Sequence, residues 1–149
     1  MTGKVFLVGA GPGDPSLITL RAVELIKKAD VVLYDRLVSK KILSMISKKA
    51  ETVYVGRAVG DDYKHQNDTN ILMVKYAKIK RNIVRLKGGD PIIFGRGGEE
   101  AEYLKKHKIQ FEIVPGITSG IGSATYAGIP LTHRKFASSV VFVTGHEDF

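Results

Sequence analysis

Residues 5–15 read Val5-Phe6-Leu7-Val8-Gly9-Ala10-Gly11-Pro12-Gly13-Asp14-Pro15. Four apolar residues run into a turn rich in glycine and proline, and a helix is expected from Leu17. This order places the carboxyl end of a strand beside the start of a helix, where open α/β sheets bind nucleotide-like ligands. The same glycines also suit an ordinary tight turn, because glycine adopts positive φ at little cost.

Asp14 separates this turn from a dinucleotide-binding motif. In the pattern Gly-x-Gly-x-x-Gly, the third glycine would stand at position 14. A carboxylate at that position would repel a pyrophosphate. The turn therefore favours a ligand that carries an adenosine group without phosphates.

Apolar strands alternate with helical patterns along the rest of the chain. Further strands are expected at residues 31–34, 52–55, 83–86, 111–114 and 140–144, and helices at 17–29, 39–46, 68–80, 97–108 and from 118 or 119 to 128. This alternation predicts an α/β fold with an open, mostly parallel sheet and helices on both faces. We expect residues 1–149 to form one domain.

The composition excludes several kinds of site. The 149 residues include no cysteine, so disulfides, thiol nucleophiles and thiolate metal sites are ruled out. The four histidines lack a metal-binding spacing, and no metal is expected. There is neither an apolar run of about 20 residues nor a signal-peptide pattern, so we expect a cytoplasmic protein without a membrane anchor.

The formal net charge of +8 suggests an acidic partner. Many of the lysines stand in scattered pairs near expected helix ends, where they favour the helix dipole. A solvated lysine-rich surface, an acidic small molecule and RNA therefore all remain open at this point.

Residues 85–100 read RLKGGDPIIFGRGGEE and contain five glycines between an expected strand and an expected helix. Gly88 and Gly89 would let a ligand approach the backbone closely. Asp90 can accept hydrogen bonds from ribose hydroxyls or a ligand ammonium. The spacing differs from that of a Walker phosphate loop. Pro91 and the apolar run 92–94 indicate a packed segment rather than a loose surface loop.

The helix expected near residues 119–128 contains Gly120 and Gly122, which lower its intrinsic propensity. Such a helix persists where something packs close to its backbone. Either a ligand or another helix would meet this requirement.

These segments together resemble the uroporphyrinogen-III C-methyltransferases of the tetrapyrrole methyltransferase family. The matching motifs stand in the same order at residues 9–15, 34–38, 85–100, 114–119, 126–134 and 144–146. The resemblance implies that S-adenosylmethionine methylates two ring carbons of uroporphyrinogen III, giving precorrin-2 for sirohaem and cobalamin synthesis. S-adenosylhomocysteine would be the second product.

The resemblance also implies roles for individual residues. Asp35 would bind the pyrrole N–H groups or take a proton, although an acid at a strand end also suits ribose binding or a turn cap. Tyr126 would line the pocket or lie in the core. The cofactor residues would be Pro12, Gly88, Gly89, Asp90, Ile93, Thr118 and Ser119. Substrate carboxylates would be bound by Arg36, Arg57, Arg96 and Arg134.

The family enzymes are longer than this chain. They carry a second α/β domain after the Thr144-Gly145-His146 segment, hold the cofactor between the two domains and form homodimers. The chain thus resembles the N-terminal domain alone, and we expect it to fold but to methylate poorly. The alternatives are a relative that methylates RNA or another precorrin, and a non-catalytic partner subunit. RNA is less favoured because the chain lacks an aromatic RNA-stacking motif.

Overall fold

The computed structural model describes residues 2–56 and 64–144, apart from the side chains of residues 64–67. Within these residues one sheet has the order β3-β2-β4-β1-β5, and every neighbouring pair is parallel. Its strands are β1 (Lys4–Gly9), β2 (Val31–Tyr34), β3 (Glu51–Tyr54), β4 (Asn82–Lys87) and β5 (Gln110–Val114). The predicted parallel α/β sheet is confirmed.

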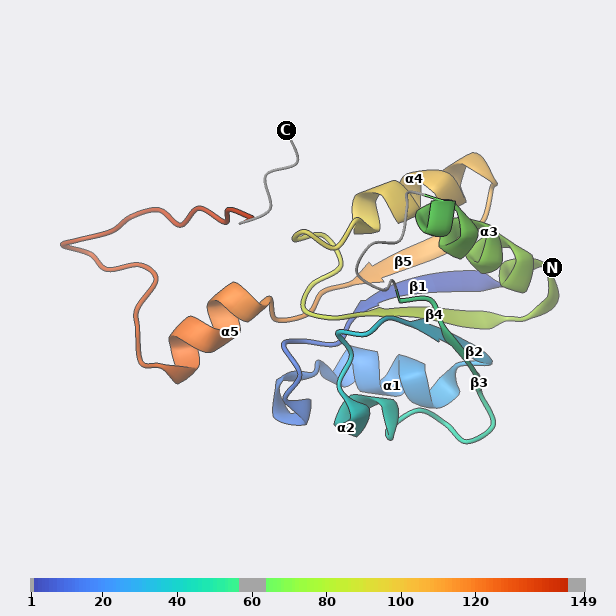
Figure 1. Ribbon diagram of the computed structural model, residues 1–149, viewed down its shortest axis with the longest axis horizontal. Helices are drawn as coiled ribbons and strands as arrows, with labels where there is room; N and C mark the ends of the chain where they lie inside the picture. Colours follow the sequence, from blue (N-terminus) through green and yellow to red (C-terminus); the bar gives the residue numbers. More distant parts are fainter. Residues whose placement is uncertain (1, 57–63, 145–149) are drawn as a thin grey trace.

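Helices cover both faces of this sheet (Figure 1). The helical elements are η1 (Pro15–Leu17), α1 (Leu20–Lys28), α2 (Lys40–Leu43), α3 (Lys64–Ile79), α4 (Gly97–Lys106) and α5 (Ser119–Tyr126). α1 and α2 lie on one face, and α3 and α4 lie on the other. α5 and the segment after it extend away from the sheet.

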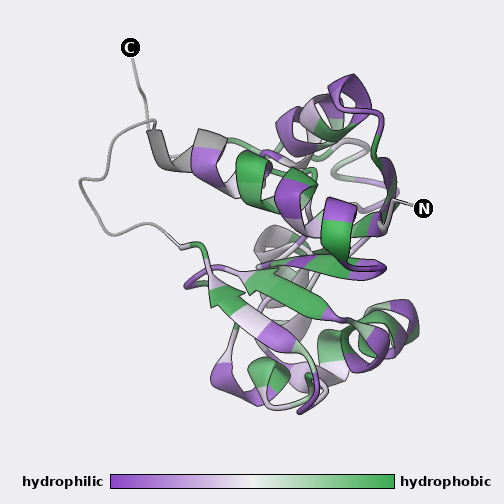
Figure 2. Cartoon of the chain, turned by 90° about the vertical axis from the view of Figure 1, so that its right-hand side faces the viewer, coloured by the Kyte–Doolittle hydropathy of each residue, from purple (hydrophilic) through white to green (hydrophobic). Residues whose placement is uncertain are grey.

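Alternating residues of each strand build two separate cores, one on each face. Phe6 and Val8 of β1 pack with Ala22 and Ile26 of α1, whereas Leu7 packs on the other face with residues of α3 and α4. Successive strand side chains point to opposite faces, so a strand buried on both faces is apolar throughout. The apolar strands lie between the helical layers in Figure 2.

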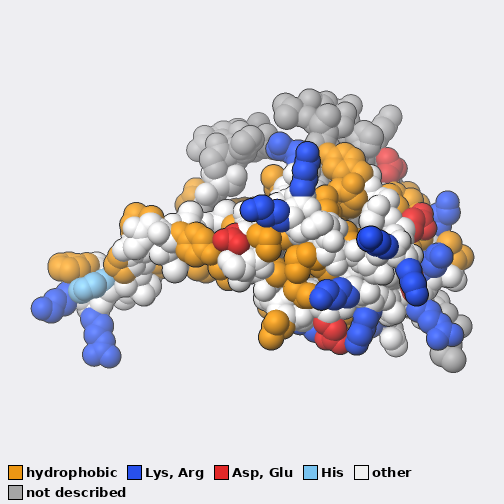
Figure 3. All heavy atoms as spheres, turned by 90° about the horizontal axis from the view of Figure 1, so that it is seen from below, with side chains coloured by type: hydrophobic (Ala, Val, Ile, Leu, Met, Phe, Trp, Pro, Cys, Tyr) orange, Lys and Arg blue, Asp and Glu red, His pale blue; other side chains and the backbone are white. Residues whose placement is uncertain are grey.

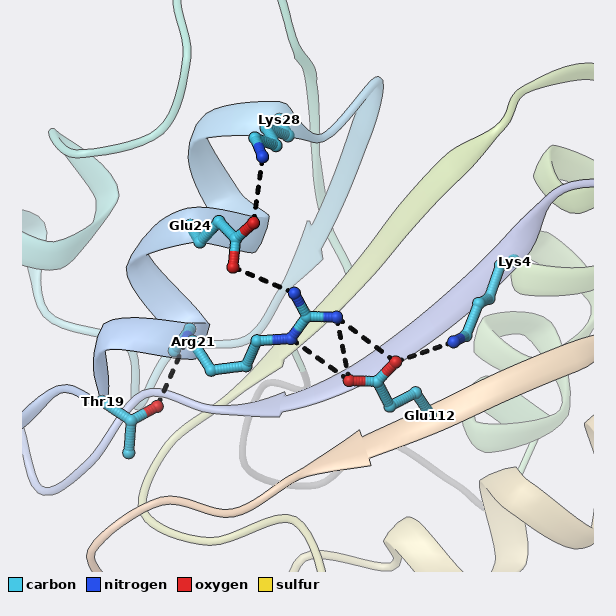
Figure 4. Close-up of polar contacts among 7 residues, drawn as sticks. Lys4, Thr19, Arg21, Glu24, Lys28 and Glu112 are labelled. Carbon is cyan, nitrogen blue, oxygen red and sulfur yellow. Dashed lines mark hydrogen bonds and ion pairs between the residues drawn. The ribbon is translucent and has the colours of Figure 1, made fainter.

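A surface network ties the edge strand β5 to β1 and α1 (Figure 4). The Glu112 carboxylate accepts hydrogen bonds from Lys4 Nζ at 2.7 Å and from Arg21 Nη2 at 3.1 Å. Arg21 also contacts Glu24, whose carboxylate binds Lys28. These pairs are partly exposed, so each contributes little to stability, but together they fix the position of α1 at this edge.

Several expected elements differ from those in the structure: the helix expected at 68–80 begins at Lys64, and the one expected at 39–46 covers Lys40–Leu43. Residues 140–144 form no strand, because the chain after α5 runs away from the sheet and leaves Val141 and Val143 about 80% exposed. β-branched residues favour a strand only where neighbouring strands and a core are present. The first helix begins at Leu20 rather than Leu17, because Thr19 caps it after the separate turn η1.

Candidate functional site

The loops that follow β1 and β4 leave the sheet toward opposite faces. β1 and β4 are neighbours, yet the chain passes from β1 to α1 and from β4 to α4. A crevice forms at the carboxyl ends of strands where connections diverge in this way. The structure has a cleft of about 510 Å³ at this place. This volume lies within the range of small-molecule sites.

The cleft gathers most of the residues that the sequence motifs single out. Asp35, Arg36 and Arg96 line it, and so do all seven residues assigned to a cofactor, which are Pro12, Gly88, Gly89, Asp90, Ile93, Thr118 and Ser119. Segments separated by more than a hundred residues thus meet at one crevice. The structure brings Thr69, Arg85, Lys87 and Phe94 to the same cleft, and the motif analysis did not assign a role to any of them.

Four glycines lie where the loops cross at the base of the cleft. Gly11 and Gly89 exchange backbone hydrogen bonds at 3.1 and 2.8 Å, and Gly89 has a φ of 65°. A Cβ atom on Gly9 would lie 2.6 Å from the Cα of Gly116. A side chain at Gly9 would therefore collide with the Gly116 backbone, whereas Gly11 and Gly89 have positive φ angles that favour glycine, so the loops themselves account for these glycines.

Asp90 fastens two of these loops together. Its Oδ1 accepts hydrogen bonds from the backbone N–H groups of Ile92 and Ile93 at 2.8 and 3.3 Å, and its Oδ2 accepts one from Gly116 N–H at 3.0 Å. Both oxygens are therefore engaged in shaping the loop. Oδ1 already accepts two hydrogen bonds, whereas Oδ2 accepts one and keeps a second acceptor position for a ligand donor.

The loop between β4 and α4 is only partly packed. Pro91 is buried, but Ile92 and Phe94 are 53% and 63% exposed, so the expectation of a packed run at 92–94 is wrong for these two side chains. Phe94 and Arg96, which both line the cleft, have φ values of 52° and 57°. Such angles are uncommon in residues other than glycine and concentrate at functional sites.

A buried cluster of charges forms one wall of the cleft. Arg85 Nη2 lies 3.3 Å from Asp35 Oδ2, and Arg85 Nε lies 3.1 Å from Glu100 Oε1. Lys87 Nζ lies 3.2 Å from the same Glu100 oxygen. Glu100 is fully buried, and the Asp35 side chain is 20% exposed. The cluster thus has two positive and two negative groups, of which Asp35 is the negative group that reaches the cleft.

Burial changes the acidity of Lys87. Removal from water, and next the positive charge of Arg85, lower the pKa of Lys87 below its ordinary value of 10.5. The Glu100 carboxylate acts in the opposite direction but does not cancel these effects. Lys87 therefore loses its proton more readily than a surface lysine does.

α5 packs its glycine-containing face against the first loop. A Cβ atom on Gly122 would lie 3.1 Å from Pro12 Cγ, and one on Gly120 would lie 3.0 Å from the Phe142 ring. Tyr126, which is 64% exposed, donates a hydrogen bond to Asp14 Oδ2 at 3.2 Å. The close neighbours of this helix are thus a loop and an extended segment rather than a second helix.

Asp14 is held by its own turn. The backbone N–H and hydroxyl of Ser16 both bond to Asp14 Oδ1 at 2.8 Å. These hydrogen bonds, with a smaller contribution from Tyr126, lower the pKa of the Asp14 carboxyl. Asp14 therefore stays ionised at the amino end of η1.

The remaining sequence-predicted residues lie elsewhere. Tyr126 and Arg134 do not line the cleft, and Arg134 stands on the exposed segment after α5. Arg57 lies outside the described residues.

His107 ends α4, and its ring contacts the Tyr103 carbonyl at 2.9 Å. Among the described residues, no group of three or more potential metal ligands occurs.

Positive charge is distributed widely over the surface. Lys and Arg side chains are spread across the face shown in Figure 3 rather than gathered in one patch. This distribution resembles a solvated lysine-rich surface more than a nucleic-acid track. In the part of the chain that the structure describes, no helix has the length and apolar character needed to cross a membrane.

Comparison with known proteins identifies relatives along almost the whole chain. A family model described as tetrapyrrole (corrin/porphyrin) methylases matches residues 4–148. Uroporphyrinogen-III C-methyltransferase of Bacillus subtilis is 56% identical over 151 residues, which cover 99% of this chain and 59% of that protein. A sirohaem synthase of Neisseria meningitidis is 58% identical over 144 residues, covering 97% of this chain and 30% of that protein. The chain thus spans 30% to 59% of the length of these relatives.

Solved structures give the same result. Uroporphyrin III C-methyltransferase of Thermus thermophilus superposes with a TM-score of 0.80 at 48% identity, covering 92% of this chain and 57% of that one. A complex of the Thermus thermophilus enzyme with S-adenyl homocysteine gives a TM-score of 0.75 at 47% identity, over 92% of this chain and 53% of that one. These matches confirm the resemblance found in the motifs: the chain belongs to the tetrapyrrole (corrin/porphyrin) methylase family.

Proposed function

We propose that this chain forms the donor-binding part of an S-adenosylmethionine-dependent methyltransferase that converts uroporphyrinogen III to precorrin-2. The observation that carries this proposal is the meeting of all seven motif-assigned cofactor residues at one cleft. The names of the relatives, which include uroporphyrinogen-III C-methyltransferase and sirohaem synthase, support the substrate assignment.

The cleft fits a methyl donor that carries no phosphate. Glycines at positions 11 and 89 leave the loop backbone open to close approach, and Thr118 begins α5 beside them. Two carboxylates, Asp35 and Asp90, line the cleft, where a pyrophosphate would be repelled. S-adenosylmethionine supplies an activated methyl group when it is bound. Pro12, Gly88, Ile93 and Ser119 would contribute the remaining contacts.

The cleft also carries groups suited to an acidic macrocycle. Arg36 and Arg96 line it, and a guanidinium binds a carboxylate through two parallel hydrogen bonds. Arg57, Arg134 and Tyr126 remain proposed substrate contacts in the complete protein. Asp35 faces the cleft and would hold the pyrrole N–H groups or accept a proton. Methyl transfer then depends mainly on the orientation of the reacting carbon toward the methyl group.

We further propose that the complete protein adds a second α/β domain to the one formed by residues 1–149. The relatives are longer than this chain, and every described residue from Thr125 to Thr144 is exposed. The exposed group includes apolar side chains such as Ile129, Phe136 and Val143, which a neighbouring domain would cover. We propose a cytoplasmic homodimer, which suits the absence of cysteine; light scattering of the full-length protein tests the dimer.

Methyl transfer by the full-length natural protein tests the proposed function. With labelled S-adenosylmethionine and uroporphyrinogen III, we expect label in a dimethylated tetrapyrrole. Asp35→Asn should lower kcat by about a hundredfold or more, in the range of general acid–base groups. Asp30→Asn is the matched control, because Asp30 precedes β2 at the opposite end of the strand and, among the described residues, its carboxylate accepts hydrogen bonds only from the Arg81 and Asn82 N–H groups.

Three outcomes would contradict the proposal. Label found only in another precorrin would assign a different substrate within the family. Label found in RNA would revive the RNA-methylating alternative. A folded full-length protein that transfers no methyl group to any tetrapyrrole would leave the chain as a non-catalytic partner.

A further inference from the structure

We propose that Glu100, a fully buried residue that does not line the cleft, positions the Asp35 carboxylate by acting through Arg85. The inference rests on the proposed function, because Asp35 is the acid expected to meet the substrate. It goes beyond that function, because it assigns a role to a residue of α4 that lies outside the cleft lining and contacts the lining residue Arg85. Glu100 is the last residue of the motif at 85–100, which gave it no role of its own.

The Asp35 carboxylate is held at both oxygens. Its Oδ1 accepts a hydrogen bond from the Leu37 N–H at 3.1 Å, and its Oδ2 contacts Arg85 Nη2 at 3.3 Å. The first contact is local and fixes the turn after β2. The second comes from β4 and therefore sets the direction of the carboxylate relative to the sheet.

Arg85 is held at each of its three side-chain nitrogens. Nη2 contacts Asp35, Nε donates to Glu100 Oε1 at 3.1 Å, and Nη1 donates to the Leu86 carbonyl at 3.1 Å. The arginine side chain is only 7% exposed. A planar guanidinium with donors in fixed directions can bridge these three acceptors at once, whereas the single nitrogen of lysine cannot.

Glu100 belongs to the first turn of α4 and is anchored by the helix. Its backbone N–H bonds to the Arg96 carbonyl at 3.1 Å, and its side chain is fully buried. Lys87 Nζ contacts the same Oε1 that receives Arg85 Nε. Two cations therefore converge on this carboxylate. The contacts run from a rigid helix, through Glu100 and Arg85, to the acid at the cleft.

Glu112 provides a matched control on the surface. It too accepts contacts from one arginine and one lysine, Arg21 and Lys4, but it lies at the outer edge of the sheet (Figure 4). Glu112→Gln and Glu100→Gln thus make the same chemical change in two comparable clusters. Of these two glutamates, only Glu100 contacts the arginine that binds Asp35.

The first experiment compares kinetics and cofactor binding in the full-length natural protein. Glu100→Gln and Arg85→Lys should each lower kcat by about a hundredfold, the loss expected when a reacting group is displaced by about 1 Å. The dissociation constant for S-adenosylhomocysteine should stay within about twofold of wild type. Normalising kcat to the number of S-adenosylhomocysteine sites removes any effect of a smaller folded fraction. Glu112→Gln should behave as wild type.

A second variant covers a failure to fold. The double substitution Glu100→Gln with Lys87→Met removes one buried charge of each sign. It takes the place of the single variant in the comparison if Glu100→Gln does not fold. A normalised kcat equal to that of Glu112→Gln would overturn the proposal. A wild-type kcat in Arg85→Lys would also overturn it, because charge alone would then suffice without the three-way bridge.

A measurement without substrate separates this inference from the proposed function. The carboxyl carbon of Asp35, labelled with ¹³C and assigned by its loss in Asp35→Asn, should change its NMR position in Glu100→Gln but not in Glu112→Gln. If wild type transfers no methyl group, the proposed function fails while this signal still decides the inference. An Asp35 signal that is unchanged by Glu100→Gln would overturn the inference.

Discussion

At the scale of single residues, the wall of the cleft depends on charges placed where an apolar strand would be expected. Arg85 and Lys87 are nearly as buried as their strand neighbours and both reach Glu100. A buried ion pair adds little stability over apolar packing, but removal of one partner costs about 3–5 kcal/mol. These residues are therefore better explained by the orientation of the site than by stability.

Lys87 gives a prediction about pH. Burial and the charge of Arg85 lower its pKa in the folded protein below 10.5. Between that lowered pKa and 10.5, the unfolded chain binds a proton that the folded chain does not. The free energy of unfolding should therefore increase as pH rises through this window. Below the window, Lys87 is charged in both states and destabilises the folded protein to its full extent.

Urea unfolding of wild type and Lys87→Met at several alkaline pH values measures this contribution. The free energy of unfolding of wild type should increase with pH relative to that of Lys87→Met, because the variant lacks the titrating lysine. Lys28→Met is the control, because Lys28 is 70% exposed and pairs with Glu24 on the surface. Equal pH dependence in wild type and both variants would contradict the assignment.

At the scale of elements, the beginning of α1 depends on one side chain. Thr19 Oγ1 accepts a hydrogen bond from the Ala22 N–H at 3.1 Å. Thr19→Ala should lower the free energy of unfolding by about 1 kcal/mol, because an orphan N–H loses its partner. Thermal or urea unfolding measures the change, and Thr2→Ala, an exposed position before β1, should have no comparable effect. A neutral Thr19→Ala would show that the cap does not stabilise the helix.

α4 and α5 should differ in their contributions to stability. Leu104 of α4 is fully buried in the core between the sheet and the layer of α3 and α4, whereas Ile121 of α5 is 43% exposed. Leu104→Ala should cost about 2–5 kcal/mol through lost packing and a residual cavity. Ile121→Ala should stay within about 0.5 kcal/mol, as surface substitutions usually do. Similar losses for both variants in urea unfolding would contradict the observed placement of α5.

The elements also show where sequence patterns succeed and fail. The strands near residues 5 and 31 could be predicted from continuous apolar runs, because they are buried on both faces, whereas the strands near 83 and 111 contain Arg85 and Glu112. The same signal wrongly predicted a strand at 140–144, where no neighbouring strand among the described residues pairs with the apolar run. The glycine motifs predicted the cleft loops, since only glycine permits their crossing. The Arg85–Glu100 contact could not be predicted, because it joins two elements through tertiary packing.

At the scale of the whole molecule, the sheet with its two helical layers forms the stable body, and residues 127–144, which follow α5, lie outside it. Ending the chain after Gly128 should leave the free energy of unfolding within about 0.5 kcal/mol of the value for residues 1–149, because the described residues 129–144 are exposed. Urea unfolding of the two chains measures this. A large loss of stability in the shorter chain would show that the segment packs on the body.

The most direct test of the cleft as the methyl-donor site is hydrogen–deuterium exchange of the full-length natural protein with and without S-adenosylhomocysteine. We predict slower exchange in peptides that cover residues 10–13, 88–93 and 117–119, with no change in peptides from α2 and β3. Binding of S-adenosylhomocysteine that leaves those three segments unchanged would contradict the assignment of the cleft. Absence of binding by the folded full-length protein would contradict the proposed methyltransferase itself.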